Sequence, residues 1–318
     1  MLNELTKRIC IALAAFSAIA IPQTAAQEAK GGSLLVRTND GRKHFILSAD
    51  AHWPLNVKER FDASALLFHN GNLLTINDRN GVVYEITLGE DAAEAKRTDL
   101  FSKSALTNAA ASRTARFDCE GLGTDASGNL YLSEESQRLI FKSPADGTSV
   151  EALKIDWSPV RKYFTGGVNA SFEGIAILGN RIFVANERTT ARIIEVDLST
   201  LEVTTSFFVD SDTFAFGGPH YSDLAVADGR LFILNRNHRC IFEIEPDNKR
   251  VLAEYRFGQM EVAEEVAYFS DYPTGAMEGL AIDDDYFWMI TDNNGKGRIK
   301  NSSDFRPTLF RCKRPQRD

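Results

Sequence analysis

A pattern of roughly fifty residues recurs five times in this chain and constrains the fold more than any other feature. Each copy begins with an acidic residue before a short apolar segment, turns at Gly, Asn or Asp, and returns through a second apolar segment that ends in polar residues. The acids that begin the copies recur every 50 to 58 residues and are Asp62, Glu120, Glu173, Asp223 and Glu278. A repeat of this length, built from β-type segments, is typical of a β-propeller.

Each copy contains enough segments for one propeller blade. Apolar runs are separated by turn sequences such as Asn70-Gly71 and Asp228-Gly229, which favour tight hairpins. A third and usually a fourth β-type segment follow the hairpin, so we expect four antiparallel strands per blade. The sequence therefore predicts an all-β fold, namely a single propeller with five blades.

The last copy lacks an obvious fourth strand before Asp318, so the ring needs a strand from elsewhere in the chain. Two N-terminal segments have the right composition, Leu34–Arg37 and His44–Leu47. We expect one of them to close the ring by joining the final blade. If both belonged to a degenerate blade, the propeller would have six blades.

The N-terminus has the layout of a secretory signal peptide. Lys7 and Arg8 precede the apolar stretch Ile9–Ile21, and small residues follow as far as Ala26. We expect cleavage after Ala26, so that residues 1–26 are removed and residues 27–318 form the propeller domain of an exported, periplasmic or secreted protein. The stretch is short for a bilayer span and no later segment is apolar enough, so we expect no stable membrane insertion after cleavage; the alternative is an uncleaved anchor or a buried helix.

The net charge limits the possible binding partners, and the cysteine content limits the possible disulfide bonds. The net charge of −8 disfavours binding to nucleic acid, because an acidic surface repels phosphate backbones. Cys119, Cys240 and Cys312 are few and widely spaced, so we expect buried unpaired thiols rather than a disulfide scaffold. Nothing in the sequence identifies a protein partner.

The hairpin geometry predicts an acidic site. In an antiparallel hairpin, the start of one strand and the end of the next lie at the same edge, so each initial acid should lie beside the polar end of its returning strand. If the first strand of every blade is innermost, all the pairs gather at one mouth of the central channel. The predicted metal ligands are Asp62, Asp78, Glu120, Glu135, Glu173, Glu187, Asp223, Glu278 and Asp292, with Asn235 as the partner of Asp223.

Crowded carboxylates are unfavourable unless they are protonated or neutralised by a cation. Oxygen ligands favour a hard cation, so Ca²⁺ is the first candidate and Mg²⁺ or Mn²⁺ the second. The alternative for each acid alone is a structural role, in which its carboxylate accepts backbone N–H bonds at a strand start.

Further residues at the same mouth are candidates for substrate binding and catalysis. Arg79, Arg188 and Arg236 follow three returning strands and could clamp a phosphate or carboxylate, or simply pair with the adjacent acids. Asn293 is a further candidate for substrate binding. His220 precedes the fourth inner strand and is a candidate general base, with a loop hydrogen bond as the alternative.

These segments resemble the phytase-like propeller family described as having esterase-like activity of phytase. The resemblance rests on Asp62–Arg79, Glu173–Arg188 and Glu278–Asn294, and it spans nearly all of the chain after residue 26. A more distant similarity to the calcium-dependent β-propeller phytases rests on Leu73–Ile86 and Asp118–Glu135. In those enzymes, inner-strand acids bind calcium ions that hold phosphate and activate water. The resemblance implies Glu120, Glu135, Glu173 and Glu278 as ligands.

Two classes of function remain. The first is a metal-dependent hydrolase acting on a small-molecule phosphate ester or another ester. The second is a non-enzymatic propeller with a structural calcium ion, whose mouth binds a ligand or a protein. The sequence lacks a Gly-x-Ser-x-Gly motif, which argues against a serine esterase of the α/β-hydrolase type.

Overall fold

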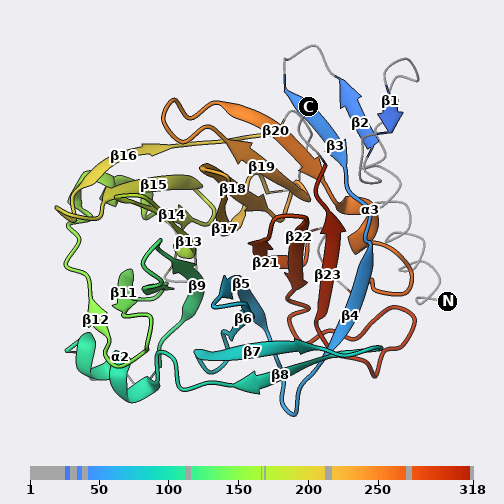
Figure 1. Cartoon of the computed structure of the whole chain (residues 1–318), viewed down its shortest axis with the longest axis horizontal. Coiled ribbons are helices and arrows are strands. Elements are labelled where there is room, and N and C mark those ends of the chain that lie inside the picture. Colours follow the sequence, from blue (N-terminus) through green and yellow to red (C-terminus); the bar gives the residue numbers. More distant parts are fainter. Residues whose placement is uncertain are drawn as a thin grey trace.

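Five blades surround a central axis in the computed structural model of the chain (Figure 1), and the outer strands of the first and last blades pair in parallel. The structure describes residues 26–28, 34–37, 42–111, 116–165, 167, 170–211, 217–269 and 274–315. The predicted all-β propeller with five blades is confirmed. Residues 1–25 of the predicted signal peptide lie outside the described residues, so that segment stays a prediction.

Each blade is an antiparallel sheet whose first strand lies nearest the axis. Blade 1 comprises β5 (Ala63–His69), β6 (Asn72–Asn77), β7 (Val82–Leu88) and β8 (Ala93–Arg97). Blade 2 comprises β9 (Cys119–Thr124), β10 (Leu130–Glu134), β11 (Leu139–Ser143) and β12 (Glu151–Ala152). Blade 3 comprises β13 (Phe172–Leu178), β14 (Arg181–Asn186), β15 (Arg192–Asp197) and β16 (Val203–Phe207). Blade 4 comprises β17 (Tyr221–Ala227), β18 (Arg230–Asn235), β19 (Cys240–Ile244) and β20 (Val251–Arg256). Blade 5 comprises β21 (Met277–Ile282), β22 (Tyr286–Thr291), β23 (Thr308–Lys313) and β4 (Ala51–Asn56).

An N-terminal strand closes the ring, as predicted, but it is neither of the two expected segments. Strand β4 is the outermost strand of blade 5 and pairs antiparallel with β23, so that Pro54 lies opposite Thr308. The expected segments instead extend blade 4: β3 (Lys43–Ile46) pairs in parallel with β20, β2 (Leu34–Arg37) pairs with β3, and β1 (Ala26–Glu28) pairs with β2. The hairpin formed by β2 and β3 pairs with the edge strand β20, because an unpaired edge offers free backbone hydrogen-bonding groups.

The helices of the described residues are short and connect consecutive blades. They are α2 (Lys103–Ala109), the 3₁₀ helix η1 (Ser158–Tyr163) and α3 (Gly258–Glu261). The hydroxyl of Ser102 caps α2 by accepting the Ala105 N–H bond. Within the described ranges, no helix has both the length and the apolar character needed to cross a membrane.

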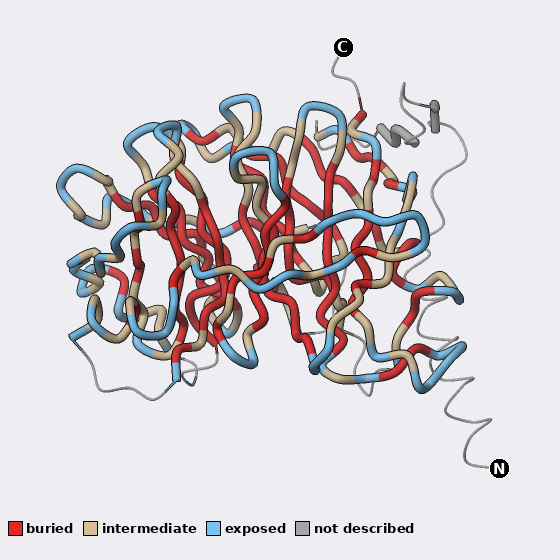
Figure 2. The backbone as a smooth tube through the Cα atoms, turned by 60° about the horizontal axis from the view of Figure 1, so that its bottom comes forward, coloured by how far each residue is buried: buried red, intermediate tan, exposed pale blue. Residues whose placement is uncertain are grey.

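The hydrophobic core lies between the faces of adjacent blades. Phe183 from blade 3 and Phe242 from blade 4, for example, are fully buried in one cluster. The buried backbone runs along the strands, whereas the loops at both ends are exposed (Figure 2). Each fully buried phenylalanine stabilises the fold by about 1.5–3 kcal/mol. Cys119, Cys240 and Cys312 are buried free thiols within this core, as predicted.

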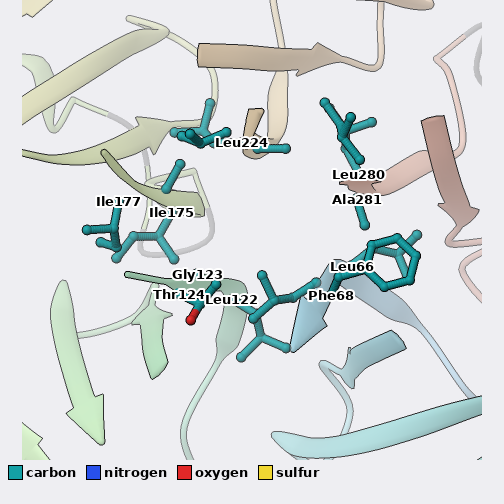
Figure 3. Close-up of a pocket in the computed structure, with 15 residues that line it drawn as sticks. Leu66, Phe68, Leu122, Gly123, Thr124, Ile175, Ile177, Leu224, Leu280 and Ala281 are labelled. Carbon is teal, nitrogen blue, oxygen red and sulfur yellow. The ribbon is translucent and has the colours of Figure 1, made fainter. Parts of the chain in front are cut away.

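The five inner strands surround a small cavity on the axis, lined mainly by apolar side chains. Figure 3 shows side chains from all five strands lining it, among them Leu66, Leu122, Ile175, Leu224 and Leu280, and its volume is about 100 Å³. Each of these five residues follows the polar start of its strand by only a few positions. The polar ends of the inner strands therefore gather at one end of this cavity.

Candidate functional site

Every inner strand carries a β-bulge directly after its first residue. In blade 2, Cys119 pairs with Glu134 and Gly121 pairs with Ser133, which leaves Glu120 without a partner on β10. The pairings of the other four inner strands shift at the equivalent place. A bulge bends a strand and re-aims the extra side chain, which is why bulges are common beside active sites.

Three sets of equivalent positions follow from these bulges. The bulge position holds Ser64, Glu120, Glu173, Ser222 and Glu278. The lead position, two residues earlier, holds Asp62, Asp118, Ser171, His220 and Ala276. The return position holds the residues whose backbone N–H groups donate to the lead-position carbonyls, with N···O distances of 2.7–3.0 Å: Asp78, Glu135, Glu187, Arg236 and Asp292.

Two of the five initial acids predicted from sequence are therefore out of register. Asp62 is equivalent to Asp118 rather than to Glu120, and Asp223 lies one residue beyond the bulge position. The predicted pairing of Asp223 with Asn235 is wrong, because Asn235 lies opposite Tyr221. The inner strands are buried on both faces and lack an alternating pattern, so the extra residue of a bulge is not visible in the sequence.

The carboxylate of Asp223 is engaged by the backbone of three inner strands. Its Oδ2 accepts N–H bonds from Leu66 at 3.2 Å and Leu280 at 2.7 Å, and its Oδ1 accepts the Leu224 N–H at 2.8 Å. Asp223 is completely buried, and burial raises its pKa well above the usual value despite these bonds. Because both oxygens already accept hydrogen bonds, we leave Asp223 out of the cation site proposed below.

The first of two candidate cation groups lies in blade 2. Asp118, Glu120 and Glu135 each place a carboxylate oxygen within 4.8 Å of the others. Glu135 also accepts the N–H of Ser171 at 2.8 Å, which ties this group to blade 3. All three donors are oxygen atoms, and an all-oxygen set is what a hard divalent cation prefers.

The second group combines carboxylates with an imidazole. Glu173, Glu187 and His220 have donor atoms that also lie within 4.8 Å of one another, and all three side chains are buried. His220 comes from the lead position of blade 4, whereas the two glutamates come from blade 3. Neighbouring blades therefore build this group jointly.

Arginines compensate the charge around the rest of the ring. Arg236 occupies the return position of blade 4, where the other blades have acids, and it pairs with Glu278. Arg60 forms a two-bond ion pair with Asp62, with N···O distances of 2.9 and 2.6 Å. Asp292 lies at the return position beside β21, where Glu278 occupies the bulge position and pairs with Arg236.

The electrostatics of the mouth reflect burial of like charges. Burial, reinforced by neighbouring carboxylates, raises the pKa of Asp78 to about 6, of Asp292 to about 7 and of Glu135 to about 8. Burial raises the pKa of Glu120 well above its usual range, and the nearby Asp78 adds to the effect. For Glu173 burial again leads, followed by the charge of Glu187. These carboxylates would bind a cation in place of their protons.

His220 has the opposite shift. Burial lowers its pKa to about 4, against the opposing influence of Glu187, so its imidazole is neutral at neutral pH. Its Nε2 contacts Glu187 Oε1. A general base works best when its pKa lies near the working pH, so this environment suits a hydrogen-bonding or ligand role better than the base role predicted from sequence.

The predicted substrate-binding residues fall into different positions. Arg79 and Arg188 follow return-position acids and keep about half of their side-chain surface exposed at the rim. The prediction that Arg236 matches them is wrong, since Arg236 itself occupies the return position and is largely buried. Asn293 is buried in a loop, where its amide donates to the Phe305 carbonyl at 2.6 Å.

Sequence reasoning missed Asp118 as a site residue, although it lies in the first cation group. It also missed Ser64, which hydrogen-bonds to Glu120, and Arg60, which neutralises Asp62. Aligning the repeats so that Asp62 corresponds to Asp118 would have identified Asp118 as a site residue. That alignment requires knowing that each inner strand contains a bulge.

The residues present fit a divalent cation. Buried oxygens without a hydrogen-bond partner lie on acids of the mouth, namely Asp78 Oδ1, Glu187 Oε2 and Glu278 Oε2. A buried carboxylate oxygen without a partner is costly, and a cation would satisfy it. The shared raised pKa values of the carboxylates point the same way.

Solved structures similar to this chain are propellers of different activities. The glutaminyl cyclase of Myxococcus xanthus superposes with a TM-score of 0.55 at 12% identity, covering 85% of this chain and 97% of that chain. A virginiamycin B lyase from Staphylococcus aureus has a TM-score of 0.39 at 12% identity, covering 90% and 78%. A luciferin-regenerating enzyme has a TM-score of 0.43 at 11% identity, covering 91% of both chains. The first likeness shows the fold alone, and the other two are too weak to support an argument.

Sequence comparison is more specific. No curated protein matches the chain. The phytase-like family described as "Esterase-like activity of phytase" matches residues 62–295, which run from the lead position of blade 1 to the loop after β22. The match thus includes all the lead, bulge and return positions of the acidic mouth. The chain belongs to this phytase-like family.

Proposed function

We propose that this protein is an exported, metal-dependent hydrolase that cleaves phosphate esters or other esters at the acidic mouth of the propeller. The observation that carries the proposal is the all-oxygen group formed by Asp118, Glu120 and Glu135. The description of the family, with its esterase-like activity, supports the same class of reaction.

Asp118, Glu120 and Glu135 would hold the cation, with Asp78 beside them. Ca²⁺ is the first candidate, and Mg²⁺ or Mn²⁺ the second, because all the donors are carboxylate oxygens. When bound, such a cation polarises an ester oxygen and lowers the pKa of a coordinated water molecule.

The chain's own residues supply binding and orientation. Arg79 and Arg188 present half-exposed guanidinium groups at the rim, where they can bind an anionic ester by paired hydrogen bonds. Ser64 hydrogen-bonds to Glu120 and orients it, and the Ser171 N–H does the same for Glu135. Arg236 holds Glu278 and keeps positive charge near Glu173.

A non-enzymatic role is the second candidate, and one observation favours it. The acids of the mouth are connected across blade boundaries, as in the Glu135–Ser171 hydrogen bond and the Arg236–Glu278 pair. A cation among them would join blades 1 to 3 and stabilise the ring even without catalysis. In that case, the mouth would bind a ligand or a protein.

Hydrolysis of p-nitrophenyl phosphate and p-nitrophenyl acetate distinguishes the two. We would assay the protein after chelation and after addition of Ca²⁺, Mg²⁺ or Mn²⁺, beside Glu120→Gln, Glu135→Gln and the exposed control Glu151→Gln in the same blade. The hydrolase proposal predicts metal-dependent rates that fall by about 100-fold in the first two variants and persist in the control. Equal, metal-independent rates in all four proteins would contradict it and leave the structural role.

A further inference from the structure

The group formed by Glu173, Glu187 and His220 differs chemically from the all-oxygen group in blade 2. It contains a nitrogen donor, and its ligands come from two blades. Imidazole combined with carboxylate is typical of sites for borderline transition metals such as Zn²⁺, whereas Ca²⁺ is bound by oxygen donors.

One atom of this group lacks the partner that a buried polar atom normally has. Glu187 is 3% exposed and its Oε2 makes no hydrogen bond, while its Oε1 contacts Nε2 of His220, which is 6% exposed. More than nine-tenths of buried polar groups are normally paired, so the orphaned Oε2 requires an explanation. A metal ion bound at this carboxylate would supply it.

The donor set is suited to a divalent ion. Glu173 and Glu187 supply two carboxylates and His220 supplies an imidazole nitrogen, and metal binding displaces any protons on these donors. Arg188 contacts Oε1 of Glu187, which leaves Oε2 as the atom available to a metal. Three protein donors also leave a coordination position open, as in catalytic zinc sites.

From this geometry we infer that Glu173, Glu187 and His220 form a second metal site, selective for a borderline transition metal such as Zn²⁺ and distinct from the hard-cation site at Asp118, Glu120 and Glu135. The second site requires no ester hydrolysis, so it can exist whether or not the protein is a hydrolase.

Calorimetric titration with Zn²⁺ tests this site. The protein would be stripped with a chelator, dialysed, and titrated with Zn²⁺ in the presence of excess Ca²⁺ to saturate the oxygen site. We expect His220→Gln to weaken Zn²⁺ binding by at least about 10-fold. The half-buried His69, the last residue of β5, provides the control His69→Gln, which should bind Zn²⁺ as the wild type does.

A second variant guards against a folding defect in His220→Gln. Glu187→Gln should also lose Zn²⁺ affinity, whereas Glu120→Gln should retain it and lose Ca²⁺ binding. Replacing Zn²⁺ with Co²⁺ gives visible absorption bands that report on the ligands, and the bands should change in His220→Gln. Unchanged Zn²⁺ affinity in both His220→Gln and Glu187→Gln, or no Zn²⁺ binding by the Ca²⁺-saturated wild type, would overturn the inference.

Discussion

Asp223 shows how much a single residue contributes to the centre of this propeller. The equivalent position, next to the bulge, holds Gly121, Gly174 and Gly279 in three other blades and Ala65 in the fourth. Only in blade 4 does a long side chain fit, because its carboxylate accepts N–H bonds from β5, β17 and β21. Asp223 therefore joins strands from three blades.

Replacing Asp223 should destabilise the fold in a graded way. Asp223→Ala leaves three buried N–H groups without acceptors, which we expect to lower the free energy of unfolding by about 3 kcal/mol or more. Asp223→Asn keeps one acceptor oxygen and should cost less. Urea unfolding measures both, with the exposed Asp284→Ala as the control. If Asp223→Ala unfolds like the control, the carboxylate does not join the blades.

The sequence predicts which acids lie at the mouth better than it predicts which of them lie next to one another. Glu120 with Glu135, and Glu173 with Glu187, are brought together as the hairpin argument predicts. Asp118 and Asp223 could not be assigned from sequence, because one extra residue in a bulge changes which side chain faces which neighbour. Arg236 could have been aligned with Asp78 and Glu187, because an asparagine directly precedes each of the three residues.

At the scale of elements, the inner strands pack against one another by direct backbone contact. A Cβ atom added to Gly174 on β13 would lie 2.4 Å from both Asp223 Cα and Leu224 N on β17. Such distances exclude any side chain at this position of blade 3, so the packing of β13 against β17 requires Gly174. The close approach also places the bulge positions of blades 3 and 4 side by side.

Gly174→Ala should therefore be strongly destabilising. The added methyl group meets backbone rather than a movable side chain, so we expect a loss of about 3 kcal/mol or more in the free energy of unfolding. Gly167→Ala is the matched control, because an added Cβ there meets nothing within 4 Å. Equal midpoints of urea unfolding for the two variants would show that β13 and β17 can separate without cost.

How well a strand could be predicted depended on the turn and strand patterns in its own sequence. The hairpins at the centre of each blade were predictable, since their strands are separated by short turns of Gly, Asn, Asp or Ser residues. The closing strand β4 was not, because its sequence contains Pro54, which usually argues against a strand away from a sheet edge. Its place is determined by long-range pairing with β23, which no local pattern encodes.

At the scale of the whole molecule, the acidic mouth makes stability depend on pH. The folded-state pKa values of Asp292, about 7, and Glu135, about 8, exceed the ordinary values of 3.8 and 4.5 that apply after unfolding. The folded protein therefore holds more protons than the unfolded chain, and its stability falls as pH rises towards 8. His220 has the opposite effect, but only between about 4 and 6.5.

This pH dependence of stability is best measured between pH 6.5 and 8, above the pH range in which His220 contributes. In a chelator, we expect the free energy of unfolding to decrease across this window. In Ca²⁺ the decrease should be smaller or reversed, because the cation favours the ionised carboxylates. Urea unfolding at several pH values measures this, and an equal slope with and without Ca²⁺ would argue against a cation at the mouth.

The central claim is that the acidic mouth binds a divalent cation, and thermal unfolding at pH 7.5 tests it most directly. Melting temperatures would be compared after chelation and with saturating Ca²⁺ for the wild type, Glu120→Gln and the exposed control Glu151→Gln. Binding at about 100 times Kd adds about 2.7 kcal/mol, so we predict that Ca²⁺ raises Tm by about 5 °C or more in the wild type and the control, and much less in Glu120→Gln. Identical melting temperatures with chelator and with Ca²⁺ would contradict the claim.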